Sequence, residues 1–233
     1  MVDSPLLLMI DTGSELCSVA LSKGNELIDE VIIEEQRAHS RVIGPLVFDI
    51  LNNNGFVATD CDAFVVCEGP GSYTGLRVGV SVAKGLCFGA DRPLIAVSSP
   101  LLIARLAIER NLTPEGCTAI YSVLDARRDE VYLGIFSAQG EILSPIEAVV
   151  VNKDSFSEAL DSGIILFAGN GAAKLSAIIS HPNARFARIE SIASGMLTPA
   201  LNAFRSGEFA DTAYFEPLYL KDFIAGTAKK RLF

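Results

Sequence analysis

The sequence is poor in the residues that most metal and acid–base sites use. Its 233 residues include no tryptophan and only two histidines, His39 and His181. Neither histidine has a second ligand at the spacing of a metal site, and no G-x-S-x-G motif marks a nucleophilic serine. Metal-dependent or histidine-based catalysis by this chain is therefore not expected. We expect His39 to cap or flank a helix that begins near Ala38.

Basic residues and paired cysteines are also scarce. The chain has 19 Lys and Arg against 28 Asp and Glu, a formal net charge of -9. Because phosphate binding needs clustered Lys and Arg, this charge argues against nucleic acid being held by the chain alone. The five cysteines form no C-x-x-C pair, which is typical of reduced thiols in a cytosolic protein. The apolar run Leu6–Ile10 is too short for a secretory signal, and no segment is suited to span a bilayer, so a cytoplasmic location is expected.

What the sequence does contain is an alternation of strand-like and helix-like segments. The expected elements of the first half are strands at 6–11, 16–22 and 26–35, a helix at 38–54, a strand at 63–67, a helix at 76–90, a strand at 94–97 and a helix at 98–110. Pro45 should kink the first helix or mark its late start. The second half repeats the order, with strands at 119–125 and 131–137, a turn at 138–143 that leads into a third strand, a strand at 164–168 and a helix at 191–206. These landmarks predict a duplicated α/β unit with a mixed sheet flanked by helices.

The most distinctive stretch is the glycine-rich loop Glu68-Gly69-Pro70-Gly71-Ser72-Tyr73-Thr74-Gly75. No lysine follows Gly75, as a P-loop requires, and Thr74 stands where a dinucleotide fingerprint has its third glycine. In the helix that follows, Gly75, Gly79 and Ala83 recur four residues apart, although glycine inside a helix costs about 1 kcal/mol relative to alanine. Gly85 and Gly89 add further small residues. We predict that another backbone approaches this helix closely.

Two other patterns suggest chemistry. Asp11-Thr12-Gly13 is typical of an aspartic protease, but that reaction needs two carboxylates that share a proton, and Asp125 is followed by Ala126-Arg127. A turn closed by the side chain of Asp11 is the alternative. A candidate anion or nucleotide cleft would use Asp11, Thr12, Gly13, Gly69, Gly71 and Ser72. The second half offers Arg127 and Arg128 in place of an acidic turn, either for an anion or for salt bridges, which weakens the nucleotide interpretation.

Several short motifs occur in an order that is found in one known family. They are Leu8-Met9-Ile10-Asp11-Thr12, His39-Ser40, Gly69-Pro70-Gly71-Ser72-Tyr73-Thr74-Gly75-Leu76-Arg77, Val97-Ser98-Ser99, Asp125-Ala126-Arg127 and Pro217-Leu218-Tyr219-Leu220. On these residues the chain resembles the TsaB (YeaZ) family, which is also described as glycoprotease-like. The resemblance implies an actin-like ATPase fold of two related lobes. The lobes are expected at 1–103, completed by 208–222, and at 104–207, with a tail at 223–233.

The resemblance also implies a function that depends on partners. The family acts with proteins that make threonylcarbamoyladenosine in tRNAs that decode ANN codons, and it binds and activates the catalytic subunit TsaD, which the ATPase TsaE joins. A metal-binding histidine pair of TsaD corresponds here to Ser99 and Ile103. No catalytic residue and no metal site are therefore expected in this chain, and ATP and metal are expected in the partner subunits. We expect a homodimer in isolation and contact with tRNA only through the complex.

The contact implied by the resemblance uses the helices expected at 38–54 and 76–90, which suits the stripe of small residues. The residues expected to bind the partner are Val42, Leu46, Ile50, Gly75, Leu76, Gly79, Val80, Ala83 and Leu86. The alternative function is a self-sufficient ATP-binding enzyme of the actin or sugar-kinase type. That enzyme would need a phosphate-binding turn in its second lobe, where the chain has Asp125-Ala126-Arg127.

Overall fold

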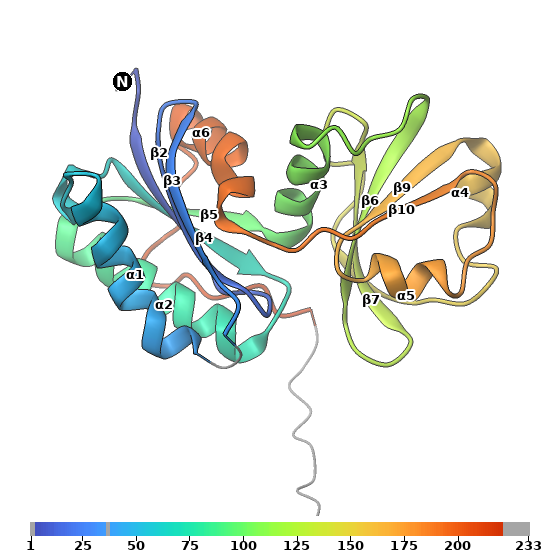
Figure 1. Cartoon of the computed structure of the whole chain (residues 1–233), viewed down its shortest axis with the longest axis horizontal. Coiled ribbons are helices and arrows are strands. Elements are labelled where there is room, and N and C mark those ends of the chain that lie inside the picture. The colour runs from blue at the N-terminus through green and yellow to red at the C-terminus, as the bar shows by residue number, and fades with distance from the viewer. Residues whose placement is uncertain (1–2, 36–37, 221–233) are drawn as a thin grey trace, which may run out of the picture.

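Two five-stranded sheets with the same topology form the frame of the protein (Figure 1). The computed structural model describes residues 3–35 and 38–220. The first sheet has the order β3-β2-β1-β4-β5 and contains β1 (Leu6–Asp11), β2 (Cys17–Lys23), β3 (Glu26–Ile33), β4 (Ala63–Gly69) and β5 (Leu94–Ser98). The second has the order β8-β7-β6-β9-β10 and contains β6 (Cys117–Asp125), β7 (Glu130–Ser137), β8 (Glu147–Val150), β9 (Ile164–Ala168) and β10 (Ala184–Ala187). In each sheet the first three strands are antiparallel and the last two run parallel to the first. The predicted duplication is confirmed.

Helices lie on both faces of each sheet, so that the molecule is built in alternating layers (Figure 1). The elements are α1 (His39–Asn53), α2 (Tyr73–Ala90), α3 (Ser99–Glu109), α4 (Ser157–Ser162), α5 (Ala172–Ser176), α6 (Leu197–Ser206) and the short 3-10 helices η1 (Ala58–Asp60) and η2 (Ala193–Met196). The pair α1 and α2 covers the outer face of the first sheet. Between the two sheets lie α3, α6 and η2, and α4 and α5 pack on the second sheet. The predicted fold class, α/β with two related lobes, is confirmed.

Strand β1 shows why a continuous apolar run becomes a central strand. All six of its residues are buried. Because side chains alternate across a strand, Leu7 and Met9 enter the core between the sheets, while Leu8 and Ile10 enter the core beneath α1 and α2. Each face of the strand thus packs against helices, as expected for a strand in a layered α/β fold.

Two expectations about element boundaries need correction. Helix α1 begins at His39, six residues before Pro45, so a late start is wrong. Pro45 is exposed, and the Arg41 carbonyl that loses its partner can bond to water. The third strand of the second half lies at β8, and at 141–143 the structure has an isolated bridge between Phe136 and Ile142. Pro145 follows soon after and has no N–H to extend that pairing.

The last described segment, 208–220, lies against the first sheet instead of continuing the second. Ala210 pairs with Leu94 of β5, and the Leu218 N–H donates to the Glu68 carbonyl at 2.8 Å. The lobe boundary expected at 103–104 falls inside α3, which packs on strands of both sheets. The tail expected at 223–233 lies outside the described residues. None of the described helices combines the length and apolarity that crossing a membrane requires.

Candidate functional site

The glycine-rich loop between β4 and α2 packs directly on the turn that follows β1. The Ser72 N–H donates to the Gly13 carbonyl at 2.7 Å. A Cβ atom at position 71 would overlap the same carbonyl oxygen, so glycine alone fits there. The Ser72 hydroxyl also accepts the Gly75 N–H at 3.3 Å and caps the start of α2. Contacts between the two backbones therefore hold the loop against the turn that follows β1.

Asp11, at the end of β1, is fully buried and hydrogen-bonded within the chain. Its Oδ1 accepts the Gly13 N–H at 2.8 Å, and its Oδ2 accepts a short hydrogen bond from the Ser191 hydroxyl. Ser191 lies between β10 and η2, so this bond links the segment leaving the second sheet to the first sheet. Burial raises the pKa of Asp11 above its usual value, although these hydrogen bonds oppose the shift. Neither partner is a carboxylate that could share a proton in protease chemistry.

The residues of the candidate anion cleft do come together, but they pack against one another. Asp11, Thr12, Gly13 and Gly69 are buried, and Gly71 and Ser72 touch Gly13. Thr12 Oγ1 donates to the Gly75 carbonyl at 2.7 Å, which removes that hydroxyl from any ligand. The geometry contradicts an open phosphate cleft between these two turns. The glycines instead allow the backbones of the two turns to come into close contact.

The corresponding turn of the second sheet is closed in a related way. A Cβ at Gly169 would overlap the Val123 carbonyl, as one at Gly71 would overlap Gly13. Asp125 forms an ion pair with Lys174, and its N–H donates to Asn170 Oδ1 at 2.9 Å. The carboxylate that matches Asp11 in the duplicated unit is thus neutralised by a lysine of the chain itself.

Ser99 and Ile103, the two positions that the sequence resemblance pairs with metal-binding histidines, lie within α3. Ser99 and Ile103 are both buried, and Ser99 Oγ lies 3.0 Å from the sulfur of Cys67. No group of three or more His, Cys, Asp or Glu side chains suited to a metal occurs among the residues described. All five cysteines are free, and burial raises the pKa of Cys61 to about 12, so that this thiol stays protonated.

The stripe of small residues on α2 faces the protein interior, contrary to its expected role at a partner interface. Gly75, Gly79 and Ala83 are buried, and a Cβ at position 75 or 79 would overlap the carbonyl or the hydroxyl of Thr12. The approaching backbone that the stripe predicted is therefore the end of β1 in the same chain. Direct contact of these three residues with a partner is ruled out by their burial.

A second set of small residues lies on the opposite, exposed face of α2. Gly85 and Gly89 are exposed, and no atom lies within 4 Å of a Cβ built at either position. At 3.6 residues per turn, Gly85 is rotated by roughly 200° from Ala83 about the helix axis. The two stripes therefore serve different surfaces, one for packing on the sheet and one open to the outside.

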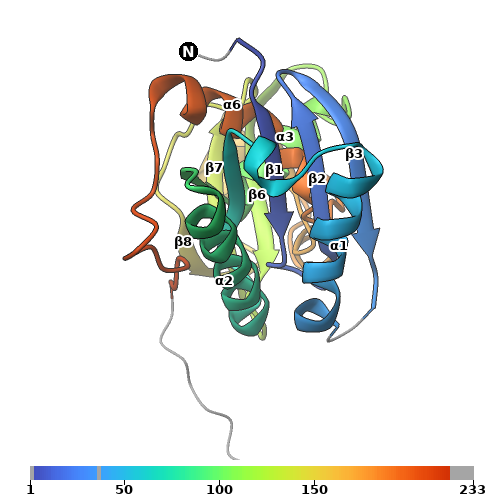
Figure 2. The ribbon, with the colours of Figure 1, turned by 90° about the vertical axis from the view of Figure 1, so that its left-hand side faces the viewer.

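The exposed face of α1 and α2 is uncovered and carries two exposed phenylalanines among polar side chains. Figure 2 shows the two helices side by side in front of the first sheet, with no other helix or strand over them. Phe48 is 68% exposed and Phe88 is 90% exposed. Between the helices runs a groove of about 410 Å³ lined by Ser40, Ile43, Tyr73, Thr74, Arg77, Val78, Ser81 and Val82. We call this surface, from the groove to Phe48, Gly85 and Phe88, the α1–α2 face.

The predicted partner-binding residues divide between this face and the core. Val42, Leu46 and Leu86 are half-buried at the surface and can reach a partner. The remaining six are buried and cannot, namely Ile50, Gly75, Leu76, Gly79, Val80 and Ala83. Sequence reasoning missed Arg77, Val78, Val82, Gly85 and Phe88. The rotation of Gly85 and Gly89 away from the first stripe is the signal that could have found them.

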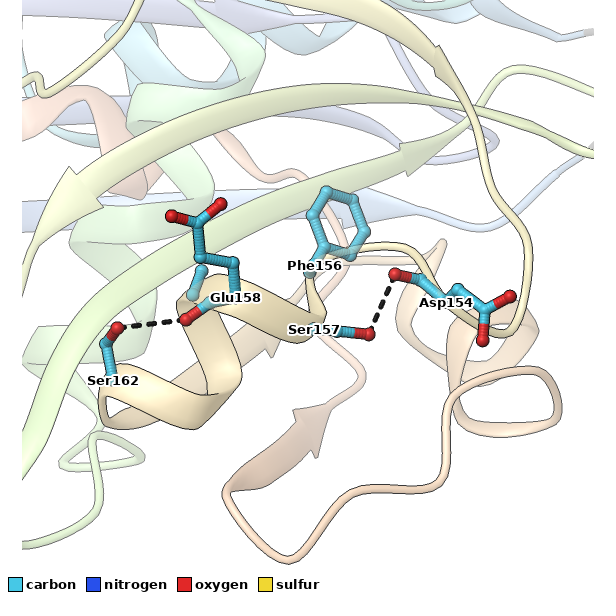
Figure 3. A pocket seen from close by; sticks show the side chains of 6 residues that line it. Asp154, Phe156, Ser157, Glu158 and Ser162 are labelled. Atoms are coloured by element: carbon cyan, nitrogen blue, oxygen red, sulfur yellow. Dashed lines mark hydrogen bonds between the residues drawn. The ribbon is translucent and has the colours of Figure 1, made fainter.

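A second hollow, of about 570 Å³, lies beside α4 (Figure 3). The side chains that line it form no arrangement suited to catalysis. The Ser157 and Ser162 hydroxyls donate to the backbone carbonyls of Asp154 and Glu158, and the two carboxylates point away from each other. The ring of Phe156 packs on Tyr121 and Phe167 in the core of the second sheet. The α1–α2 face is therefore the stronger candidate site.

Comparisons with known proteins agree with the sequence motifs. A family model described as "TsaD: tRNA N6-adenosine threonylcarbamoyltransferase" matches residues 26–229. The tRNA threonylcarbamoyladenosine biosynthesis protein TsaB of Haemophilus influenzae is 41% identical over 128 residues, which cover 54% of this chain and 51% of that protein. Its Escherichia coli namesake is 40% identical over 126 residues, which cover 54% of this chain and 52% of that protein. The chain thus spans about half the length of the curated relatives it matches.

Similarity of structure extends further than similarity of sequence. The solved structure of YeaZ from Pseudomonas aeruginosa superposes with a TM-score of 0.79 at 29% identity, covering 93% of this chain and 100% of that chain. The match includes both sheets, because it spans nearly the whole chain. The two-lobed α/β fold implied by the motifs is confirmed.

The two glycine stripes should respond oppositely to the same substitution. Gly79→Ala should destabilise the fold by about 1–3 kcal/mol, because the new methyl group overlaps the Thr12 hydroxyl. Gly85→Ala should stabilise it by about 0.5–1 kcal/mol, since the methyl group meets open space and alanine favours the helix. Urea unfolding followed by circular dichroism measures both. Equal stability of the two variants would contradict the assignment of faces.

Asp11 should make stability depend on pH with a defined sign. Burial raises its pKa above the usual 3.8, so the native state keeps this proton where the unfolded chain has lost it. The stability from this proton is complete below the unfolded pKa and is lost as pH rises through the folded pKa. Asp11→Asn, which cannot lose a proton, should flatten that part of the profile in urea unfolding from about pH 4 to about pH 8.

The matched control for that experiment is Asp125→Asn, at the equivalent strand end of the second sheet, where the carboxylate side chain is 47% exposed. This variant should keep the pH-dependent fall in stability of the wild type. The interpretation fails if the stability of Asp11→Asn decreases with rising pH as much as that of the wild type. It also fails if Asp125→Asn abolishes this decrease.

Proposed function

We propose, because the chain belongs to the TsaB (YeaZ) family within the wider TsaD family, that it is a partner subunit in tRNA threonylcarbamoyladenosine biosynthesis. In this proposal it docks on a TsaD-type tRNA N6-adenosine threonylcarbamoyltransferase through the α1–α2 face. It contributes no catalytic group, and it stabilises the active conformation of the enzyme that it binds.

The observation that carries the proposal is the uncovered helix pair with its exposed Phe48 and Phe88. Isolated soluble domains rarely leave large contiguous apolar patches exposed, and such patches mark interaction sites. Phe88 is 90% exposed beside Gly85 and Gly89, whose lack of side chains lets another helix come close. An apolar ridge with small residues at its centre suits packing against helices of a partner.

The closed turns at the ends of β1 and β4 support a non-catalytic role. Asp11 is sealed by Ser191, and Gly71 lies against Gly13, where a kinase-like protein would hold phosphate and a cation. The second lobe adds the Asp125–Lys174 ion pair in place of an open acidic turn. These contacts argue against the self-sufficient ATP-binding enzyme. We assign ATP and metal to the TsaD and TsaE subunits.

The acidic balance of the chain supports an indirect relation to tRNA. With a formal net charge of -9, the chain as a whole repels a polyanion. The partner supplies the basic surface in this proposal, and TsaE joins the resulting pair. In this proposal the chain forms a homodimer only when TsaD is absent.

Reconstitution tests the function as a whole. Modification of an ANN-decoding tRNA is measured with the TsaD and TsaE proteins of the same organism, omitting each subunit in turn. Omission of this chain should abolish modification, and its addition should restore it. Full modification without this chain would overturn the proposed function.

The face itself is tested by a large side chain at its centre. Gly85→Leu should weaken binding to TsaD by about 10- to 100-fold, because overpacking a close contact costs about 1–3 kcal/mol. The fold should survive, since position 85 faces open space. Isothermal titration calorimetry measures the affinity, and circular dichroism checks the fold.

The matched control is Asn202→Leu, which adds an exposed leucine to α6, away from the α1–α2 face. It should bind TsaD like the wild type. A folded Gly85→Leu protein with unchanged affinity would show that the docking surface lies elsewhere.

A further inference from the structure

The segment 208–220 is fastened along one flank of α2, opposite to the flank that α1 occupies (Figure 2). Lys84 of α2 donates to the carbonyls of Ala213 and Phe215 at 3.0 and 3.1 Å. Closer to the start of α2, Arg77 Nε donates to the Tyr219 hydroxyl at 2.9 Å. The exposed ridge of α2 is therefore bordered by α1 on one side and by this segment on the other.

Arg77 lies between two aromatic rings. The central guanidinium carbon lies 4.0 Å from the ring centroid of Tyr73 and 5.7 Å from that of Tyr219. The contact joins the glycine-loop motif to the Pro217–Leu220 motif, 142 residues away in the sequence. Arg77 is nevertheless exposed and lines the groove between α1 and α2. An aromatic contact and one hydrogen bond thus fix an arginine that faces the candidate partner site.

The terminal nitrogens of Arg77 remain available to a partner. Its printed contact uses Nε, and the two terminal nitrogens form no hydrogen bond with the described residues. A guanidinium presents its donors as a planar fork that matches a carboxylate. Because the stack already restricts the side chain, less conformational entropy is lost when such a carboxylate binds.

The positive charge on α2 favours a partner that carries an acidic side chain. In a chain of net charge -9, α2 carries Arg77 and Lys84 and no acidic residue along its length. Lys84 is engaged with the carbonyls of segment 208–220, and Arg41 of α1 is paired with Glu35. The charge that α2 offers in the groove is therefore the positive charge of Arg77.

We propose that Arg77 recognises a carboxylate on a docked helix of the partner subunit, and that Tyr73 and Tyr219 position its guanidinium for that contact. The occupant is a different protein with an apolar helix that carries an acidic side chain, not a second copy of this chain. A symmetric dimer through this face would bring two acid-free, positively charged α2 helices together. This inference rests on the proposed function and names the chemistry of the partner.

The experiment measures the dissociation constant of the complex with TsaD of the same organism at low and high salt. Arg77→Ala should weaken binding about 10-fold or more at low salt, and the affinity of this variant should depend less on salt. Arg77→Lys should recover little of the affinity, because an ammonium group lacks the planar fork. Tyr219→Phe keeps the ring, loses the hydroxyl that holds Nε, and should fall between the wild type and Arg77→Ala.

Arg205→Ala is the matched control, since Arg205 is an exposed arginine on α6. It should leave both the affinity and its salt dependence unchanged. A merely structural role of Arg77 would lower thermal stability without changing the salt dependence, and that result would overturn the inference. So would unchanged binding by a folded Arg77→Ala protein.

The outcomes separate this inference from the proposed function. If Gly85→Leu blocks binding while Arg77→Ala does not, docking stands and the carboxylate contact is wrong. If the wild-type chain does not bind TsaD, the proposed function itself fails. If Arg77→Ala weakens self-association in sedimentation as strongly as it weakens binding to TsaD, the choice of a different protein as occupant is overturned.

Discussion

The close contact of α2 with the end of β1 determines most of what this protein can do. Thr12 Oγ1 donates to the Gly75 carbonyl, and the Ser72 N–H donates to the Gly13 carbonyl, both at 2.7 Å. Such an approach is open only to a helix without side chains at that point, which explains glycine at 75 and 79 despite its cost in a helix. The same contact leaves the turn after β1 and the glycine-rich loop packed against each other. It also turns the other face of α2 outward.

In both duplicated halves a glycine turn packs against a backbone carbonyl, but the outer helices of the two halves differ. Both glycine turns press against a carbonyl of the first strand or the turn that follows it. In the first half, the outer helices α1 and α2 have 15 and 18 residues, whereas their counterparts α4 and α5 have 6 and 5. Short helices suffice to cover a sheet edge. The extra length in the first half forms the broad outward surface of the α1–α2 face.

Local patterns in the sequence predicted the strands, the long helices and the duplication, because apolar periodicity and glycine turns are local signals. The same local patterns did not predict the features that depend on contacts between distant segments of the chain. Both faces of α2 are apolar, with Leu76 and Val80 inward and Val78 and Val82 near the surface, so composition alone did not identify the buried face. The candidate anion residues were correctly grouped, but only the structure shows that they touch one another. The Arg77–Tyr219 contact was invisible because 142 residues separate its members.

Several hydrogen bonds hold the segment that leaves the second sheet against the first sheet. Here Ser191 bonds to Asp11, the Ala193 N–H donates to Ser18 Oγ at 2.9 Å, and the Ser194 N–H donates to Glu30 at 2.8 Å. These contacts tie the segment that leaves the second sheet to three strands of the first. The side chains and backbone of residues 191–194 therefore fix the start of the chain that leads to α6 against the first sheet, at the same strand end where the glycine-rich loop packs on the turn after β1.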